Sequence, residues 1–353
     1  MATLTPEAMA DLIKSTLADL DRNAINQFAT TLQNYEVMGK LLRSDRTTFH
    51  DGRKLQWNMM TDHAHSARSV GLYEKDSLNV GDYLQTAEAP WRFLTDNWAY
   101  EYREALMNRG SSRIVDELAA RKAASLISTA EALEAKFWDC PVDSEDVLEP
   151  FGIYYWITKH ATEGFYGGNN LIYTSGRGGL SSGTYARYKN WTGQYVNVTK
   201  NDLIKKMRKA YEYCQWKMPT NVATIRSGEV MNRIYCAYAT LAELETVGES
   251  QNENLGRDIA SMDGKILFRG MPVVWVPYLD NDTDLPVFML NMNDFQVATL
   301  EGDYLRTTGP IRADEYHNVF AFHTDLTYQF IAKQLRTHAV LSKSIAYPTS
   351  LYE

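Results

Sequence analysis

The sequence is poor in cysteine, and its cysteines are not grouped. Cys140, Cys214 and Cys236 lie far apart and form no CxxC pair. This spacing excludes a zinc knuckle and a framework of disulfides. We expect three buried thiols in a reducing compartment.

Long apolar runs are also missing. No window approaches the 18 consecutive apolar residues of a transmembrane helix, and Met1 to Asn23 carries too many charges for a signal peptide. We therefore expect no membrane partner. The 353 residues are 44% hydrophobic and 23% charged, which excludes a collagen or a disordered tail and is typical of a soluble globular protein.

Positive charge is in short supply. The chain has 36 basic and 44 acidic residues, a net charge of −8, whereas proteins that grip nucleic acid usually have the opposite sign. One segment departs from this balance, because Arg187 to Lys217 holds eight basic and two acidic residues. We interpret it as the solvated face of a helix, with contact to an acidic partner or nucleic acid as the alternative.

Motifs for nucleotide binding are absent: there is no P-loop, and no GxGxxG between a strand and a helix. Gly179 to Gly183 matches GxSxG, in which Ser181 would be the nucleophile of a hydrolase. That motif needs a buried strand before it, but residues 174–178 read Thr-Ser-Gly-Arg-Gly. We expect a flexible loop instead, and a serine hydrolase at Ser181 remains the enzymatic alternative.

Two segments resemble metal sites only in part. Asp280 to Asp284 begins like a calcium loop, but Leu285 and Asn291 occupy the positions that need glycine and glutamate, so we expect a solvated turn. The pair His63 and His65 lacks a specified third ligand. The sequence therefore predicts no metal, no cofactor and no catalytic residue.

Hydrophobic periodicity predicts an α+β protein, with helices first and strands in the last third. A long amphipathic helix is expected over Ser111 to Phe137, with Glu134 on its solvent face, and another from Thr199, where Thr199 and Asp202 suggest a capping box. The expected strands are Lys265 to Phe268, Met271 to Tyr278, Val287 to Leu290, Val297 to Leu305 and Asn318 to Thr324, and the tail from Tyr328 to Ile345 could be strand or helix.

A hairpin is expected near the N-terminal end, from Arg53 to Met59 and from Arg68 to Tyr73, with Met60 to Ser66 between the strands. Few large apolar residues are available there to anchor it. A long two-stranded hairpin is marginal alone in water. It therefore needs a partner surface or stays mobile.

Two stretches resemble major capsid proteins of tailed bacteriophages, which have the Hong Kong 97-like (Johnson) fold. The first is Gly178-Gly179 through Trp191 and the helix at Val198 to Ala210, similar to the family's glycine pair, its W-x-N/T segment and the helix that follows. The second is Gly264 to Asp280, similar to its G-K-x-L-x-G-x-P-V-V strand pair. The order of elements extends the resemblance over nearly the whole chain.

The resemblance implies a division into named parts. These are an N-arm (1–42), an extended E-loop (43–90), a peripheral domain with a spine helix (91–150 and 286–345), an axial domain (151–285) and a C-terminal tail (346–353). It places an assembly interface on the E-loop, with these candidate residues: Arg53, Lys54, Trp57, Arg68, Tyr73 and Lys75.

The implied function is a major capsid protein. Copies would assemble as pentamers and hexamers into an icosahedral shell around double-stranded DNA, in a virion assembled in the bacterial cytoplasm. Expected partners are a separate scaffolding protein, since the N-arm is short, a portal at one vertex, a decoration protein, and DNA without sequence-specific contact. An encapsulin-like nanocompartment shell is the alternative within the same fold.

Overall fold

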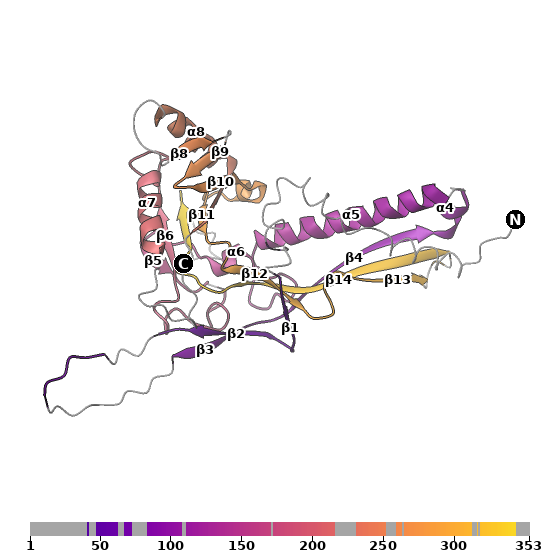
Figure 1. Ribbon diagram of the computed structural model, residues 1–353, viewed down its shortest axis with the longest axis horizontal. Coiled ribbons are helices and arrows are strands. Elements are labelled where there is room, and N and C mark those ends of the chain that lie inside the picture. Colours follow the sequence, from indigo (N-terminus) through magenta and orange to yellow (C-terminus); the bar gives the residue numbers. More distant parts are fainter. Residues whose placement is uncertain are drawn as a thin grey trace. The chain divides into compact units, whose positions relative to one another are not determined.

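The chain is described by a computed structural model, which covers residues 41, 47–62, 67–72, 83–107, 111–170, 172–215, 231–251, 259–262, 265–312, 316 and 318–343. Two compact units divide these residues (Figure 1). The first unit takes its described residues from 1–51, 91–137 and 297–329, and the second from 52–90, 138–296 and 330–353. The expected N-terminal helix lies outside the described residues.

The first unit is built on a five-stranded sheet. Its strands run in the order β1 (Thr48–His50), β12 (Phe295–Leu300), β14 (Val319–Ala332) and β13 (Arg306–Arg312), and β4 (Arg92–Glu101) also pairs with β14. The β4–β14 pairing is antiparallel and continuous from Val319↔Glu101 to Tyr328↔Arg92. Figure 1 shows these two strands running side by side beneath the helix α5.

Helix α5 (Ser111–Phe137) has the bounds that its periodicity predicts. It follows the short helix α4 (Tyr102–Met107) and packs against β4, where the Arg121 guanidinium donates to the Ala99 carbonyl at 2.6 Å. Leu133 and Phe137 are buried as expected. The prediction for Glu134 was wrong: the side chain is 1% exposed, because the buried stripe extends one position around the helix from Leu133.

The second unit is built on an eight-stranded sheet. Its strand order is β5 (Gly164–Gly167), β6 (Asn190–Gln194), β15 (Ala339–Ser342), β11 (Val287–Leu290), β7 (Arg233–Cys236), β10 (Met271–Trp275), β9 (Lys265–Phe268) and β8 (Ile259–Met262). The helical elements of this unit are α6 (Ile153–Trp156), α7 (Leu203–Cys214), α8 (Tyr238–Gln251) and the 3-10 helix η1 (Pro277–Asn281).

The core of the second unit lies between the sheet and α7. The helix buries Leu203, Ile204, Met207, Ala210 and Cys214 in a core cluster that it shares with strands β6, β7, β11 and β15. The predicted capping box did not form. The Asp202 carboxylate instead accepts the amides of Val196 and Asn197, at 2.7 and 2.9 Å, because the chain turns back over it before the helix begins.

The strands of the last third were predicted well where the apolar pattern is local. Strands β9 and β11 have the expected bounds. Strand β10 ends at Trp275, earlier than expected, because Pro277 begins η1. The expected strand at Asn318 continues to Ala332, so the tail is strand in β14 and again in β15. The mixed α+β class is confirmed.

The hairpin prediction was half wrong. Strand β2 (Leu55–Met60) lies where it was expected, but its partner is β3 (Leu84–Ala89), and residues 68–72 form no strand. The strand register indicates why β3 is the partner of β2, because it sets Leu55 opposite Ala89 and Trp57 opposite Ala87. Small residues opposite large ones let this face of the hairpin pack closely against the rest of the unit.

The thiols of Cys140, Cys214 and Cys236 are buried and free, as expected. Burial raises the pKa of Cys140 and of Cys236 to about 12, so neither thiol ionises near neutral pH. No helix among the described residues is both long and apolar enough to cross a membrane. Within the same residues, no group of three or more His, Cys, Asp or Glu side chains is placed to hold a metal ion.

Candidate interface at the base of the β2–β3 hairpin

The β2–β3 hairpin has a buried base and an exposed distal part. At the base, Leu55, Ala87 and Ala89 are at most 1% exposed. Further out, Met60 is 57% exposed and Leu84, its pairing partner, 59% exposed. The last backbone contact described before the gap joins the Thr61 amide to the Tyr83 carbonyl at 3.0 Å. The hairpin is therefore buried at its base, and beyond Met60 an exposed ion pair joins Asp62 to Arg187 at 3.6 Å.

The base is anchored to the glycine-rich loop of the second unit. The Glu88 amide donates to the Gly178 carbonyl at 3.0 Å, and the Gly178 amide donates to the Tyr155 hydroxyl at 2.9 Å. Trp57 meets Trp156 edge to face, with ring centroids 6.1 Å apart. The expectation that only a foreign surface anchors the hairpin was therefore wrong for its base.

Gly178 suits this contact for two reasons. Its φ of +60° lies in the left-handed region, which glycine adopts without strain. A Cβ at this position would lie 3.4 to 3.5 Å from Trp57, Ala87 and Trp156, so any larger side chain would push the hairpin away.

Arg177 lies next to Gly178 and organises the loop from inside. It is 0% exposed. One terminal nitrogen donates to the Trp156 carbonyl at 2.5 Å and to the Asn190 side-chain oxygen at 3.0 Å. The other donates to the carbonyls of Gly167 and Tyr188, at 2.9 and 3.0 Å. Burial lowers the pKa of Arg177 to about 10. The expectation of a flexible loop was therefore wrong at this point.

The structure brings together only part of the predicted interface set. Lys54 is exposed, and its amine pairs with the Glu88 carboxylate across the hairpin at 2.8 Å, which lowers the pKa of Glu88. Trp57 lies at the anchor, Arg53 is exposed just before β2, and Arg68 is exposed in the stretch 67–72. Tyr73 and Lys75 lie outside the described residues.

Sequence reasoning missed Arg177, the residue that shapes this site. A single arginine among glycines is typical of a loop. The four oxygens that accept hydrogen bonds from its guanidinium belong to residues up to 21 positions away. The one local signal is the neighbouring Gly176, whose φ is +99°. A Cβ at this position would lie 2.1 Å from the Leu180 carbonyl oxygen. This signal indicates a tight turn but no buried charge.

Ser181 is not placed as a hydrolase nucleophile. No strand precedes it and no helix follows it within residues 172–190. Its hydroxyl accepts from the Asn169 side-chain amide at 2.9 Å and from the Gly183 amide at 3.3 Å, so its contacts are those of a turn. The motif hydrogen-bonds to the loop around it and supplies no general base.

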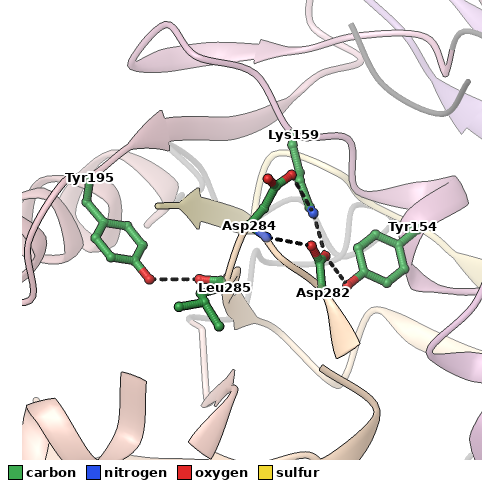
Figure 2. Close-up of polar contacts among 6 residues, drawn as sticks. All are labelled: Tyr154, Lys159, Tyr195, Asp282, Asp284 and Leu285. Atoms are coloured by element: carbon green, nitrogen blue, oxygen red, sulfur yellow. Dashed lines mark hydrogen bonds and ion pairs between the residues drawn. The ribbon is translucent and has the colours of Figure 1, made fainter. Parts of the chain in front are cut away.

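The segment Asp280 to Asp284 is only in part the solvated turn that was expected, because Asp280, Asn281 and Thr283 are exposed but Asp284 is 3% exposed. Figure 2 shows Asp282 and Asp284 converging on Lys159, whose side chain is 2% exposed. Its amine lies 2.5 Å from an Asp282 oxygen and 3.3 Å from an Asp284 oxygen, and the Tyr154 hydroxyl donates to Asp282 at 2.7 Å. Burial raises the pKa of Asp284, although Lys159 opposes that shift. Both carboxylates therefore pair with a buried lysine.

Comparison with known proteins gives no match by sequence and clear matches by structure. No protein-family model and no curated protein matches the chain. The structure is similar to the capsid asymmetric unit of Cyanophage A-1(L), with a TM-score of 0.57 and 13% identity over 87% of this chain and 92% of that chain. It is also similar to the capsid of a native GTA particle, with a TM-score of 0.50 and 10% identity over 88% and 91% of the two chains.

A weaker likeness links the chain to the holo-SrpI encapsulin complex from Synechococcus elongatus PCC 7942. The TM-score is 0.48 and the identity 10%, over 89% of each chain. The two stronger matches cover most of each chain, include both compact units and come from a cyanophage capsid and a GTA particle capsid. The chain therefore has the Hong Kong 97-like fold of phage capsid proteins.

Proposed function

We propose that this chain is a major capsid protein, which assembles as pentamers and hexamers into an icosahedral shell around the double-stranded DNA genome of a tailed bacteriophage. The observation that carries the proposal is the fold shared with the Cyanophage A-1(L) capsid over 87% of the chain. The described residues supply no catalytic arrangement at Ser181 and no metal cluster that would favour an enzyme.

The two compact units take the roles of the two capsid domains in this proposal. The unit with α5 and the β4–β14 sheet is the peripheral domain, and α5 is its spine helix. The unit with the eight-stranded sheet is the axial domain, which in this proposal also takes β11, β15 and residues 138–150 from the stretches expected in the peripheral domain. The β2–β3 hairpin is the E-loop, and residues 53–75 form its contact with a neighbouring copy.

Exposed apolar residues on the hairpin support this role. Outside the buried base, Met60, Val70, Leu72 and Leu84 are 57%, 58%, 88% and 59% exposed. Isolated apolar residues on a surface are ordinary, but several on one projecting segment indicate a surface that another molecule covers. In a shell that molecule is the next subunit. Burial of this apolar surface in the contact stabilises the assembly by about 25 cal/mol per Å² of area.

The proposal includes further partners and a location. A separate scaffolding protein directs assembly, a portal occupies one vertex, and a decoration protein binds the outside of the shell. The packaged DNA is held without sequence-specific contacts, which agrees with the net charge of −8. The assembled protein lies in the virion capsid, after assembly in the cytoplasm of the bacterial host.

A hairpin replacement tests the proposal. Residues 61–83 are replaced by Asn-Gly, which joins the paired residues Met60 and Leu84 through a two-residue turn. Because the base keeps its anchor at Gly178, the variant folds as a monomer but forms no shells. The measurements are circular dichroism for folding and negative-stain microscopy for assembly, with the wild-type chain prepared in parallel.

The outcomes separate the candidates. Normal shells from the folded variant would contradict the role of the hairpin. Wild-type shells that contain DNA-packaging proteins support the phage capsid, whereas shells filled with a co-purifying cargo enzyme would favour an encapsulin-like nanocompartment.

A further inference from the structure

Strand register in the second unit assigns α7 to one face of the eight-stranded sheet. Ile234 in β7 lies opposite Met289 in β11, which in turn lies opposite Ala339 in β15. These three residues share the hydrophobic core with α7. Since opposed residues in antiparallel strands point to the same side, α7 covers the face to which Ile234 and Met289 belong.

The neighbouring residues in the same strands point to the opposite face. Tyr235 lies opposite Phe288, and Phe288 lies opposite Val340. Trp138 contacts the Tyr235 ring with centroids 5.2 Å apart, and Tyr154 contacts the Phe288 ring at 5.5 Å. The segment that begins at Trp138 therefore lies on the face away from α7.

An ordered loop with exposed apolar side chains follows Trp138. In residues 139–149, Val142 is 75% exposed, Val147 68% and Leu148 76%. The Asp146 carboxylate accepts the amides of Leu148 and Glu149, at 2.9 and 3.2 Å. The loop thus presents aliphatic side chains to solvent from a hydrogen-bonded frame. Its charged residues are Asp139, Asp143, Glu145, Asp146 and Glu149, and none is basic.

The outer surface of α7 carries positive charge and an exposed aromatic ring, which complement the acidic and aliphatic side chains of the loop. Lys205, Lys209 and Tyr213 are four residues apart, so they form one stripe along the helix, and all three are exposed. Tyr213 is 60% exposed and packs beside Trp191, with ring centroids 4.9 Å apart. Lys209 pairs with Glu163 at 2.9 Å, but an exposed pair of this kind contributes little and exchanges partners readily.

We propose that the acidic apolar loop 139–149 of one subunit docks on the lysine–tyrosine stripe of α7 in the next copy of this chain. The inference rests on the proposed capsid function and names the axial surfaces that join neighbours within a capsomer. Two different patches on opposite faces of one sheet form a heterologous contact, and such contacts close into rings when the rotation between copies allows it. The aliphatic side chains pack on Tyr213, and Glu145 faces Lys205.

A charge exchange tests this contact. The variants are Glu145→Lys, Lys205→Glu and the double variant that carries both. Each single change places like charges together and raises the protein concentration needed for assembly by about tenfold, whereas the double variant returns to within about threefold of wild type. Sedimentation and negative-stain microscopy measure assembly, and a thermal melt checks folding.

Two further variants complete the test. Leu148→Ser removes an aliphatic contact without changing charge, and it also raises the threshold. Glu301→Lys, at an exposed position of the first unit, matches the charge change of Glu145→Lys and leaves the threshold at the wild-type value. An equal effect of Glu301→Lys would show that net charge alone is responsible, which would overturn the inference.

The remaining outcomes keep the two proposals apart. If the wild-type chain forms no shells, the proposed capsid function fails. If it forms shells and the single charge variants assemble at the same threshold, or if the double variant is not rescued, the contact is wrong while the capsid function stands. If Glu145→Lys or Leu148→Ser shells assemble normally but lose a co-expressed second protein, the loop binds that protein and the self-contact is overturned.

Discussion

Arg177 shows how one buried side chain shapes a surface that it does not reach. Its guanidinium is 0% exposed and donates to oxygens of Trp156, Gly167, Tyr188 and Asn190. A planar fork with several donors suits four converging acceptors, and a lysine amine cannot replace it. The glycine loop that carries the hairpin anchor therefore depends on this arginine.

Arg177→Lys tests that dependence. We expect the unfolding free energy to fall by about 2–4 kcal/mol, because buried acceptors lose their donors while a buried charge remains. Urea unfolding measures the change, and Arg187→Lys at an exposed position is the matched control. A loss below about 0.5 kcal/mol, the size of an ordinary surface change, would show that Arg177 is not an organising residue.

His338 gives the pH dependence of the second unit. It is fully buried against Phe295, and its Nδ1 accepts the Asn291 amide at 3.1 Å. Burial lowers the pKa of His338 from 6.5 to about 3, and the charge of Arg177 acts in the same direction. As the pH falls below 6.5, the unfolded chain therefore binds a proton at His338, whereas the folded chain does not. The stability from His338 is present above pH 6.5 and is lost as the pH falls from 6.5 toward 3.

His338→Gln keeps an acceptor but removes the titration. We expect the wild-type chain to lose up to about 1.4 kcal/mol of unfolding free energy per pH unit more than the variant below pH 6.5. Urea unfolding at several values between about pH 7 and pH 4 measures both slopes. Equal slopes would show that His338 takes up its proton in the folded state.

At the scale of elements, the hairpin combines an anchored base with an exposed distal part. Trp57 against Trp156 and the Glu88–Gly178 hydrogen bond hold the base, whereas Met60 and Leu84 face solvent. A rigid base fixes the direction in which the distal part projects. Under the proposed capsid function, this division suits an element that contacts a neighbouring copy while its base stays packed on its own chain.

Trp57→Ala tests the anchor separately from assembly. Removal of the ring lowers the free energy needed to detach the base of the hairpin from the rest of the unit. We therefore expect trypsin to cut at Lys54 about tenfold faster in the unassembled chain. Met60→Ala, at a 57% exposed position of the same strand, is the control and leaves the rate unchanged. Equal rates in wild type and Trp57→Ala would place the anchor elsewhere.

Sequence patterns predict the elements that local interactions determine, and they fail where the interacting residues come from distant segments of the chain. The periodicity of Ser111 to Phe137 predicts its helix with the observed bounds, and the local apolar pattern predicts β9 and β11 with the observed bounds. The partner of β2 was predicted wrongly, because a hairpin partner is chosen by cross-strand fit and not by local pattern. The buried charges of Arg177 and Lys159 were not predicted, since their acceptors come from distant segments.

At the scale of the whole molecule, similarity in structure persists where similarity in sequence has faded. The identity to the Cyanophage A-1(L) capsid is 13%, yet the two folds correspond over 87% of this chain. Two of the motifs on which the family resemblance rests are structural: Gly178-Gly179 forms a turn, and residues 265–280 form β9, β10 and most of η1.

Electron microscopy of the chain, expressed alone and with its neighbouring genes, tests the capsid function most directly. We expect closed shells with pentamers and hexamers when a scaffolding protein is present, and capsomer rings before closure. A folded monomer or dimer in both preparations, at concentrations where the fold is intact by circular dichroism, would contradict the capsid function.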